Sequence, residues 1–370
     1  MTGLAKQLRS RSLAHGRTDL QGLRGDPMST HIRFGYLFDF RNPEAWRRPW
    51  PEFYAEQLEF ISWTETAGFE GVWLAEHHGS IEDGYMPSPL MAAQAIAMKT
   101  NSMRIATGIA LAPFYHPVRL AEDAAILDNM SNGRLDLALA VGYRRVEAEG
   151  YGFDFKSRGR RTDEMVQILT RLWKGESVSF NGEFFQLKNS RIAPLPLQQP
   201  HLPLFLGGVT APAVRRAAQF GDGFLGPIEH YAAYAQFLRE LGRDPAKMRV
   251  GTMGRDDIWL MVSEDPEKTL DEVAPHMYYQ HNSYAKWWAA EGTSYAGTVS
   301  AQDDKLDLES FKKSGVLKIL TPHEAIAHIR TRRELGPFES YCMQVPPGFP
   351  VKKLAESAQL FANKVMPAFR

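Results

Sequence analysis

Residues 72–78 read Val-Trp-Leu-Ala-Glu-His-His, so four apolar side chains run directly into three polar ones. Four consecutive apolar residues predict a strand buried on both faces, as in a parallel sheet. A helix is predicted before this strand, because Tyr54, Leu58 and Ile61 have helical spacing and Gly68 follows where a C-terminal cap belongs. The stretch therefore predicts one β-strand of an alternating β/α fold, with polar groups at its carboxyl end.

The same alternation continues along the chain. Further strands are predicted at 32–40, 104–112, 134–142, 204–206, 223–225, within 249–263 and near 340–345. Helices are predicted at 88–100, 118–130, 160–174, 211–220, 229–242, from about 266, and at 350–364. Eight strands alternating with helices predict an α/β protein with a (β/α)8 TIM barrel. A doubly wound open sheet is the structural alternative.

Two segments interrupt the alternation and are predicted as insertions. Residues 178–187 carry an Asn-Gly turn between β-rich arms, which predicts a β-hairpin. Residues 276–320 are predicted as a long loop or lid, and large aromatic side chains gather there, including Tyr284, Trp287 and Trp288. These side chains would line an apolar substrate pocket, although packing between subunits explains them equally well.

Residues 1–28 are predicted as a disordered extension, and 29–370 as a single barrel domain. The extension is rich in Lys, Arg, Ser and Gly, which fits either a transit peptide or an upstream-extended reading frame. In the whole chain, 43 Lys and Arg balance 43 Asp and Glu, which removes the electrostatic drive toward nucleic acid or an anionic membrane. No apolar run is long enough to span a bilayer, and the single cysteine, Cys342, excludes an intramolecular disulfide framework. We therefore expect a cytoplasmic protein.

The strongest candidate for chemistry is Glu76-His77-His78, because the active site of a TIM barrel lies at the carboxyl ends of its strands. Successive strand residues point to opposite sides, so His77 is expected to face away from Glu76 and His78. This argues against a metal held by both histidines, and we expect no metal site. A histidine here suits acid-base chemistry near neutral pH, and a hydrogen-bonded structural histidine is the alternative.

A second candidate is the turn at 206–212, Leu-Gly-Gly-Val-Thr-Ala-Pro. Glycines allow a ligand close to the backbone, Thr210 can cap the following helix, and its N–H groups suit a phosphate. A plain turn with a helix cap explains the same residues. The start of the helix at 160–174 adds candidates for a phosphate contact, which are otherwise solvated surface: Arg158, Arg160 and Arg161. The Gly-x-Gly-x-x-Gly at 221–226 follows a helix and enters a strand, so it is not a dinucleotide motif.

Several motifs occur in one order along the chain. They are Leu-Ala-Glu-His-His at 74–78, His-Pro-Val-Arg at 116–119, Glu-Asp at 122–123, Leu-Asp-Asn-Met-Ser-Asn-Gly-Arg at 127–134 and Gly-Gly at 207–208. In these motifs the chain resembles the bacterial luciferase-like flavin-dependent monooxygenases, over about residues 32–226 and more weakly beyond. The resemblance implies a TIM barrel that binds FMN at the carboxyl ends of its strands.

The resemblance also implies roles for individual residues. His77 is expected to be the active-site histidine near the reactive face of the flavin. The substrate pocket is expected at Glu76, His78, Tyr284, Trp287 and Trp288. The flavin ring and ribityl chain are expected along Gly108, Ile109, Ala140, Val141, Gly142 and Tyr143. The phosphate is expected at Arg158, Gly207, Gly208, Val209 and Thr210.

The activity implied is that of a two-component FMN-dependent monooxygenase, a homodimer by resemblance. Reduced FMN from a separate NAD(P)H:flavin reductase would react with O2 to a C4a-(hydro)peroxyflavin, which oxygenates an apolar organic substrate. Light emission is not expected, because Ala-Val stands at 140–141 where light-emitting members have Cys-Arg, and Val209 replaces an acidic residue.

Three other functions are weighed against this one. A deazaflavin-dependent oxidoreductase performing hydride transfer would use a cationic groove, which Arg144, Arg145 and Arg158 could supply. A flavin-binding protein without turnover is a second alternative. A glycosidase is disfavoured, because it needs two carboxylates at strand ends and the fourth strand ends in Gly-Tyr.

Overall fold

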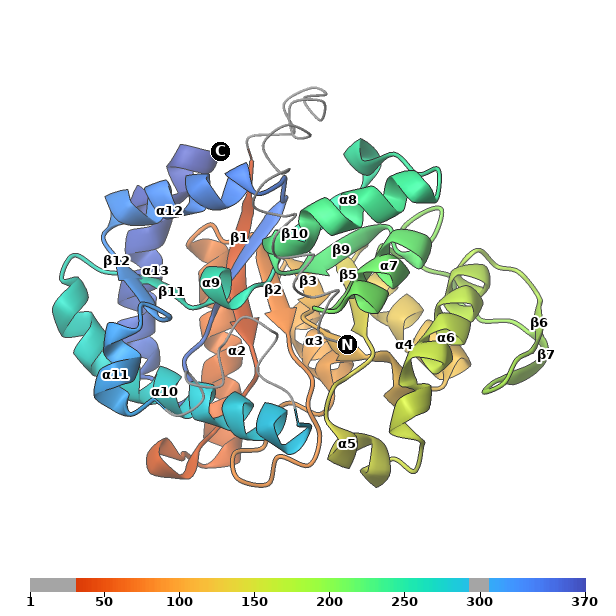
Figure 1. The fold of residues 1–370 in the computed structure, drawn as a ribbon, viewed down its shortest axis with the longest axis horizontal. Helices are drawn as coiled ribbons and strands as arrows, with labels where there is room; N and C mark the ends of the chain where they lie inside the picture. The colour runs from red at the N-terminus through yellow and green to blue at the C-terminus, as the bar shows by residue number, and fades with distance from the viewer. Residues whose placement is uncertain (1–30, 293–305) are drawn as a thin grey trace.

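Eight parallel strands close into the predicted barrel in a computed structural model that describes residues 31–292 and 306–370 (Figure 1). In chain order they are β1 (Arg33–Phe38), β2 (Gly71–Leu74), β3 (Arg104–Thr107), β5 (Leu135–Ala140), β8 (Leu204–Gly207), β9 (Gly223–Gly226), β10 (Arg249–Thr252) and β13 (Ser340–Gln344). They pair in the order β3-β2-β1-β13-β10-β9-β8-β5, and pairing of β3 with β5 closes the ring. Every carboxyl end therefore lies at one mouth of the barrel.

Helices cover the outside of the barrel. They are α2 (Trp50–Thr66), α3 (Pro89–Lys99), α4 (Pro117–Met130), α6 (Arg158–Trp173), α7 (Ala211–Phe220), α8 (Tyr231–Glu240), α12 (Pro322–Glu334) and α13 (Val351–Lys364). On α6, the predicted apolar face is fully buried, with Met165, Ile168, Leu169 and Leu172 against the strands. Gly68 has the positive φ of +95° that a residue ending α2 requires, which confirms the predicted cap. Among the described residues, no helix is both long and apolar enough to cross a membrane.

The hairpin insertion is confirmed, and two strand predictions need correction. β6 (Val178–Asn181) and β7 (Gln186–Ser190) pair antiparallel beside α6 (Figure 1). The predicted strand at 104–112 is interrupted by a cis peptide at Gly108–Ile109, after which β4 (Ala110–Leu111) adds to β5. The region 249–263 holds two strands, because α9 (Arg255–Ile258) separates β10 from β11 (Leu260–Val262). β11 pairs with β12 (Lys318–Leu320) outside the barrel.

The predicted loop or lid at 276–320 is wrong for most of its length. Residues up to Ala290 belong to α10 (Pro266–Ala290), and α11 (Leu308–Lys313) and β12 follow. The helix predicted from about 266 is α10, and the prediction misses its extent beyond residue 276 because α10 buries polar side chains there, His276, Gln280 and His281, together with apolar ones. Residues 293–305, like the extension at 1–28, lie outside the described residues.

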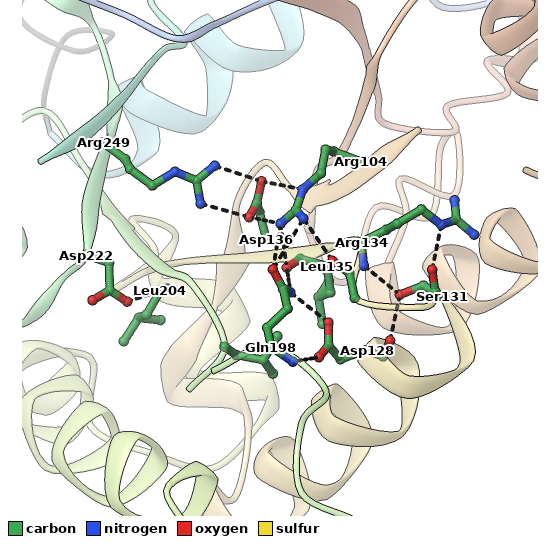
Figure 2. A network of polar contacts seen from close by, with 12 residues as sticks. Arg104, Asp128, Ser131, Arg134, Leu135, Asp136, Gln198, Leu204, Asp222 and Arg249 are labelled. Atoms are coloured by element: carbon green, nitrogen blue, oxygen red, sulfur yellow. Dashed lines mark hydrogen bonds and ion pairs between the residues drawn. The ribbon is translucent and has the colours of Figure 1, made fainter. Parts of the chain in front are cut away.

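The amino end of the barrel is held by ion pairs around Asp136 on β5 (Figure 2). Arg104 on β3 donates from Nε at 3.2 Å and Arg249 on β10 from Nη1 at 3.1 Å, while Arg33 on β1 lies at 3.4 Å. Burial would raise the pKa of Asp136, but Arg249 and Arg104 outweigh it and lower that pKa below its ordinary value. This buried carboxylate on β5 therefore links its strand to β1, β3 and β10.

The motif at 127–134 lies at this same end. Asp128 accepts hydrogen bonds from the backbone N and Nε2 of Gln198 at 2.9 and 2.7 Å. Arg134 donates to the carbonyls of Ala97, Thr100 and Met103 on the α3–β3 connection. These contacts fix α4 and β5 to their neighbours, so this motif is structural and lies far from the strand ends that form the mouth.

Candidate active site

His77 follows β2 at the mouth of the barrel and is enclosed by aromatic side chains. Its ring centroid lies 4.7 Å from that of Tyr85, 5.0 Å from Trp287 and 5.3 Å from Tyr143. Its Nδ1 lies 2.9 Å from Oε1 of Glu147, and its Nε2 lies 3.4 Å from the hydroxyl of Tyr143. One ring nitrogen therefore faces a carboxylate and the other faces a phenol hydroxyl. Only 6% of the residue is exposed, so the site is largely shielded from solvent.

Glu147, on α5 (Arg145–Gly150), is a partner that the sequence did not indicate. Its Oε1 accepts three hydrogen bonds of 2.9 Å, from His77 Nδ1, the backbone N of His78 and Arg144 Nη1. Burial would raise its pKa, but these neighbours, His77 first, lower the pKa of Glu147 below its ordinary value. The carboxylate is therefore ionised near neutral pH. A short helix beyond the fourth strand carries no periodicity that could have singled it out.

Glu76 and His78 face away from His77, as the strand alternation predicts. Nε2 of His78 lies 2.9 Å from Oε1 of Glu76, which also accepts from the Tyr115 hydroxyl at 3.0 Å. Nδ1 of His78 lies 3.0 Å from the Tyr151 hydroxyl. Burial raises the pKa of Glu76, although His78 opposes this. In the part of the chain that the structure describes, no three His, Cys, Asp or Glu side chains gather as they would around a metal ion.

Arg41, just beyond β1, anchors α10 to the mouth. Its Nε donates to Oδ2 of Asp83 at 2.5 Å and its Nη2 to Oγ of Ser283 on α10 at 2.8 Å. Burial raises the pKa of nearby Asp39 to about 6, although Arg41 opposes this. Asp39 and Arg41 come directly after the first apolar run, so the reasoning applied to Glu76-His77-His78 would have found them.

The aromatic residues near the end of α10 pack around His77 at the mouth of the barrel. The Tyr284 hydroxyl is 2.9 Å from that of Tyr85, and Trp288 stacks on Tyr143 with centroids 4.2 Å apart. Trp287 also contacts a cation, since the Arg144 guanidinium lies 4.2 Å from its ring centroid. In Figure 1 this end of α10 lies beside α5, and Glu291 accepts a hydrogen bond from the backbone N of Arg145. The helix therefore covers the mouth with ring faces.

Three strand ends expected to border a flavin lie close together. Ile109 follows β3, and a Cβ built on Gly207 at the end of β8 would lie 2.3 Å from its Cδ1. β5 ends at Ala140, and Val141 and Gly142 lead from it to Tyr143; Gly142 has φ of +74°. The carbonyl of Gly142 accepts from Nε of Arg158 at 3.2 Å. Arg158, at the start of α6, therefore reaches the carboxyl end of β5.

The β8–α7 turn and Arg158 have the character of an anion site. Gly208 has φ of +144°, and Thr210 occupies the N-cap of α7 without the side-chain hydrogen bond that the sequence suggested. The first N–H groups of a helix have no intrahelical acceptor. Burial lowers the pKa of Arg158, Glu291 opposes this, and the positive charges of Arg145 and Arg216 lower it further. A phosphate would relieve this repulsion, so the residues present fit one.

The other two candidate arginines are engaged elsewhere. Arg160 pairs with Glu183 of the β6–β7 hairpin at 2.9 Å, and both side chains are exposed. Nε of Arg161 donates to the carbonyl of Pro113 at 3.1 Å. Of the three, Arg158 is the one that contacts the residues following β5.

The closed barrel and the polar groups at its carboxyl mouth define a TIM-barrel enzyme. Residues 28–338 match the family of luciferase-like monooxygenases, and the chain belongs to this family. It is an oxidoreductase family, and the resemblance in the sequence motifs is thereby confirmed.

Individual relatives differ in cofactor. The chain is 28% identical over 336 residues to the oxygenase component of a flavin-dependent trigonelline monooxygenase of Acinetobacter baylyi, covering 86% of this chain and 90% of that one. It is 25% identical over 298 residues to an F420-dependent glucose-6-phosphate dehydrogenase of Amycolatopsis mediterranei, covering 75% and 85%. Its fold matches the FMN complex of the oxygenating constituent of 3,6-diketocamphane monooxygenase from Pseudomonas putida, with a TM-score of 0.74, 17% identity, and 92% and 99% coverage. Family membership alone therefore does not fix the cofactor.

Proposed function

We propose that this chain is the oxygenase component of a two-component monooxygenase that uses reduced FMN and O2 to oxygenate an apolar substrate. The observation that carries the proposal is the arrangement of the mouth, where a buried histidine enclosed by aromatic rings follows β2 and a candidate anion site follows β5 and β8 at the same end of the barrel. Such a site suits a planar ring joined to a phosphate. The likeness to the oxygenase component of a flavin-dependent trigonelline monooxygenase supports the flavin and the two-component arrangement.

In this proposal the chain binds, orients and shields the cofactor. Residues 108–109 and 140–143 border the ring, and Arg158 with the 207–210 turn holds the phosphate. Reduced FMN, when bound, supplies the electrons that activate O2. His77 holds or donates a proton at Nε2, and Tyr284, Trp287 and Trp288 exclude water and contact the apolar substrate. The rings of Tyr85, Tyr143, Tyr284 and Trp287 around His77 form what we call the aromatic chamber. Glu76 and His78 would shape its outer wall.

Deazaflavin-dependent hydride transfer is the second candidate. It is favoured by the F420-dependent relative and by Arg145, whose charge acts on Arg158 and would suit a longer anionic tail.

The decisive experiment is anaerobic titration of the purified protein with reduced FMN and, separately, with reduced F420, followed by O2 and a panel of apolar aromatic compounds. Tight FMN binding and product that requires O2 are expected. Preferential F420 binding would overturn the proposal, and FMN retention without any O2-dependent product would favour a flavin-binding protein.

Arg158→Ala is expected to weaken FMN binding by roughly 10- to 100-fold, because a hydrogen bond to a charged group contributes about 1.5–3 kcal/mol. Binding of riboflavin, which lacks the phosphate, should not change. Fluorescence titration of both ligands measures the difference. Arg160→Ala, which removes an exposed arginine of the same helix, is the matched control and should leave both affinities unchanged. Equal losses for FMN and riboflavin would contradict a phosphate contact.

We also propose that the chain forms a homodimer through α3 and α4. Met91 and Met98 lie seven residues apart on one face of α3, and Ile126 and Met130 lie on the adjacent α4, all four exposed. Such an apolar surface is typical of an interface.

The double substitution Met91→Glu and Met98→Glu should convert a dimer to a monomer in sedimentation velocity, whereas Leu241→Glu beyond α8 should not. A monomeric wild-type protein would contradict the proposal.

A further inference from the structure

We propose that Glu147 is a positioning residue that fixes the tautomer of His77, keeping the proton on Nδ1 and presenting the lone pair of Nε2 to the aromatic chamber. The tautomer follows from contacts of this chain alone. Only its consequence for turnover rests on the proposed function, in which Nε2 is the atom that exchanges a proton.

The geometry of Glu147 leaves one arrangement of protons. Three donors converge on Oε1 at 2.9 Å, and two of them, the backbone N–H of His78 and the guanidinium of Arg144, can only donate. An ionised carboxylate has no proton to give, so the third contact requires that Nδ1 of His77 donates. The lowered pKa of Glu147 agrees with this.

The carboxylate is itself held in place. Arg144 donates from Nη1 to the carbonyl of His78 at 3.0 Å as well as to Glu147, and its guanidinium lies over the ring of Trp287. A rotation of the His77 ring that exchanged Nδ1 for a carbon would leave Oε1 facing a C–H group and would lose the hydrogen bond of 2.9 Å. One ring orientation and one tautomer are therefore favoured together.

The remaining oxygen of Glu147 supports a functional role. Oε2 is buried and has no hydrogen-bond partner among residues 31–292 and 306–370. A buried acceptor without a partner costs stability, and holding a charged acceptor beside His77 is one explanation for keeping it. Glu76 differs in this respect, because both of its oxygens have partners: Oε1 accepts from the Tyr115 hydroxyl and Oε2 from the backbone N of Leu111.

Nitrogen-15 NMR of histidine-labelled, flavin-free protein well above neutral pH tests the inference directly. The His77 signal, assigned by its loss in His77→Gln, should show a protonated Nδ1 and an unprotonated Nε2. In Glu147→Ala this preference should be lost. Glu147→Gln should retain it, because His78 N and Arg144 both require the amide oxygen at the position of Oε1. A wild-type protein with the proton on Nε2 overturns the inference, even if the alanine variant fails to fold.

Turnover provides the second measurement. With FMN loaded, Glu147→Ala should lower kcat by roughly 100-fold, the lower range for a positioned acid or base, with FMN affinity changed only a few-fold. Glu147→Gln should recover most of kcat. Asp257→Asn, which removes an equally buried carboxylate paired with Arg332, is the control and should leave the His77 signal unchanged. Full activity in a folded Glu147→Ala variant would overturn the role, whereas failure to bind FMN would count against the proposed function and leave the tautomer result intact.

Discussion

His77→Ala is expected to lower the turnover of the FMN-loaded protein by roughly 10²- to 10⁴-fold, the range for removal of a positioned acid or base. Flavin affinity should change only a few-fold, because the proposed function assigns the ring and phosphate contacts to other strand ends. The imidazole is the titratable group at the centre of the aromatic chamber that lies within hydrogen-bond range of both Glu147 and the Tyr143 hydroxyl. Its loss should therefore affect the chemical step rather than binding.

Product yield and consumption of reduced flavin, measured together, distinguish a slow reaction from one in which O2 consumption is uncoupled from product formation. In the variant, O2 should still be consumed, but oxygenated product should fall relative to hydrogen peroxide, because proton control is lost while the flavin stays bound. His276→Gln is a suitable control, since this buried histidine of α10 contacts the carbonyl of Pro347 away from the chamber. Unchanged turnover and product yield in His77→Ala would show that the histidine is structural.

The barrel could be predicted from the sequence because its signals are local. Apolar runs of four residues mark strands such as β2, and glycines with positive φ, such as Gly68, mark the helix ends. The sheet pairing of a short apolar run is not local. For this reason the sequence predicts one strand within 249–263, whereas the structure has two. The second, β11, lies outside the barrel and pairs with β12 more than fifty residues away.

The site was predicted only where its residues sit on strand ends. His77 and the 207–210 turn follow apolar runs, so the fold class alone places them at the mouth. Glu147 and α10 reach the mouth through tertiary packing instead. Glu147 contacts His77 from seventy positions along the chain, and Gln280 reaches Asp39 across 241. The buried polar residues of α10 hide its helical pattern, since periodicity analysis assumes that buried positions are apolar.

The amino end of the barrel is expected to contribute stability and the carboxyl end cofactor binding, and Asp136→Asn should affect the first without the second. Removing one charge from a buried ionic cluster leaves Arg33, Arg104 and Arg249 without their shared partner, which typically costs about 3–5 kcal/mol of unfolding free energy. FMN affinity should stay within a few-fold, because these residues lie at the amino ends of the strands (Figure 2). Urea unfolding at neutral pH measures the first effect and flavin titration the second.

The contribution of Asp136 to the free energy of unfolding should also depend on pH. The folded-state pKa of Asp136 is lowered, so its contribution is fully present above its unfolded pKa of about 3.9 and is lost as the pH falls through the folded value. The stability gap between wild type and Asp136→Asn should therefore be constant near neutral pH and narrow below about pH 4. Asp222→Asn is the control, because that carboxylate accepts from the backbone N of Leu204 and is not fully buried, so its loss should cost about 1 kcal/mol. Glu339 lies 2.6 Å from Nη2 of Arg249 and 3.9 Å from Nη1 of Arg33. Should Asp136→Asn prove as stable as the wild type, Glu339 would suffice for these two arginines, and the barrel would be closed by its apolar layers rather than by the ion pairs to Asp136.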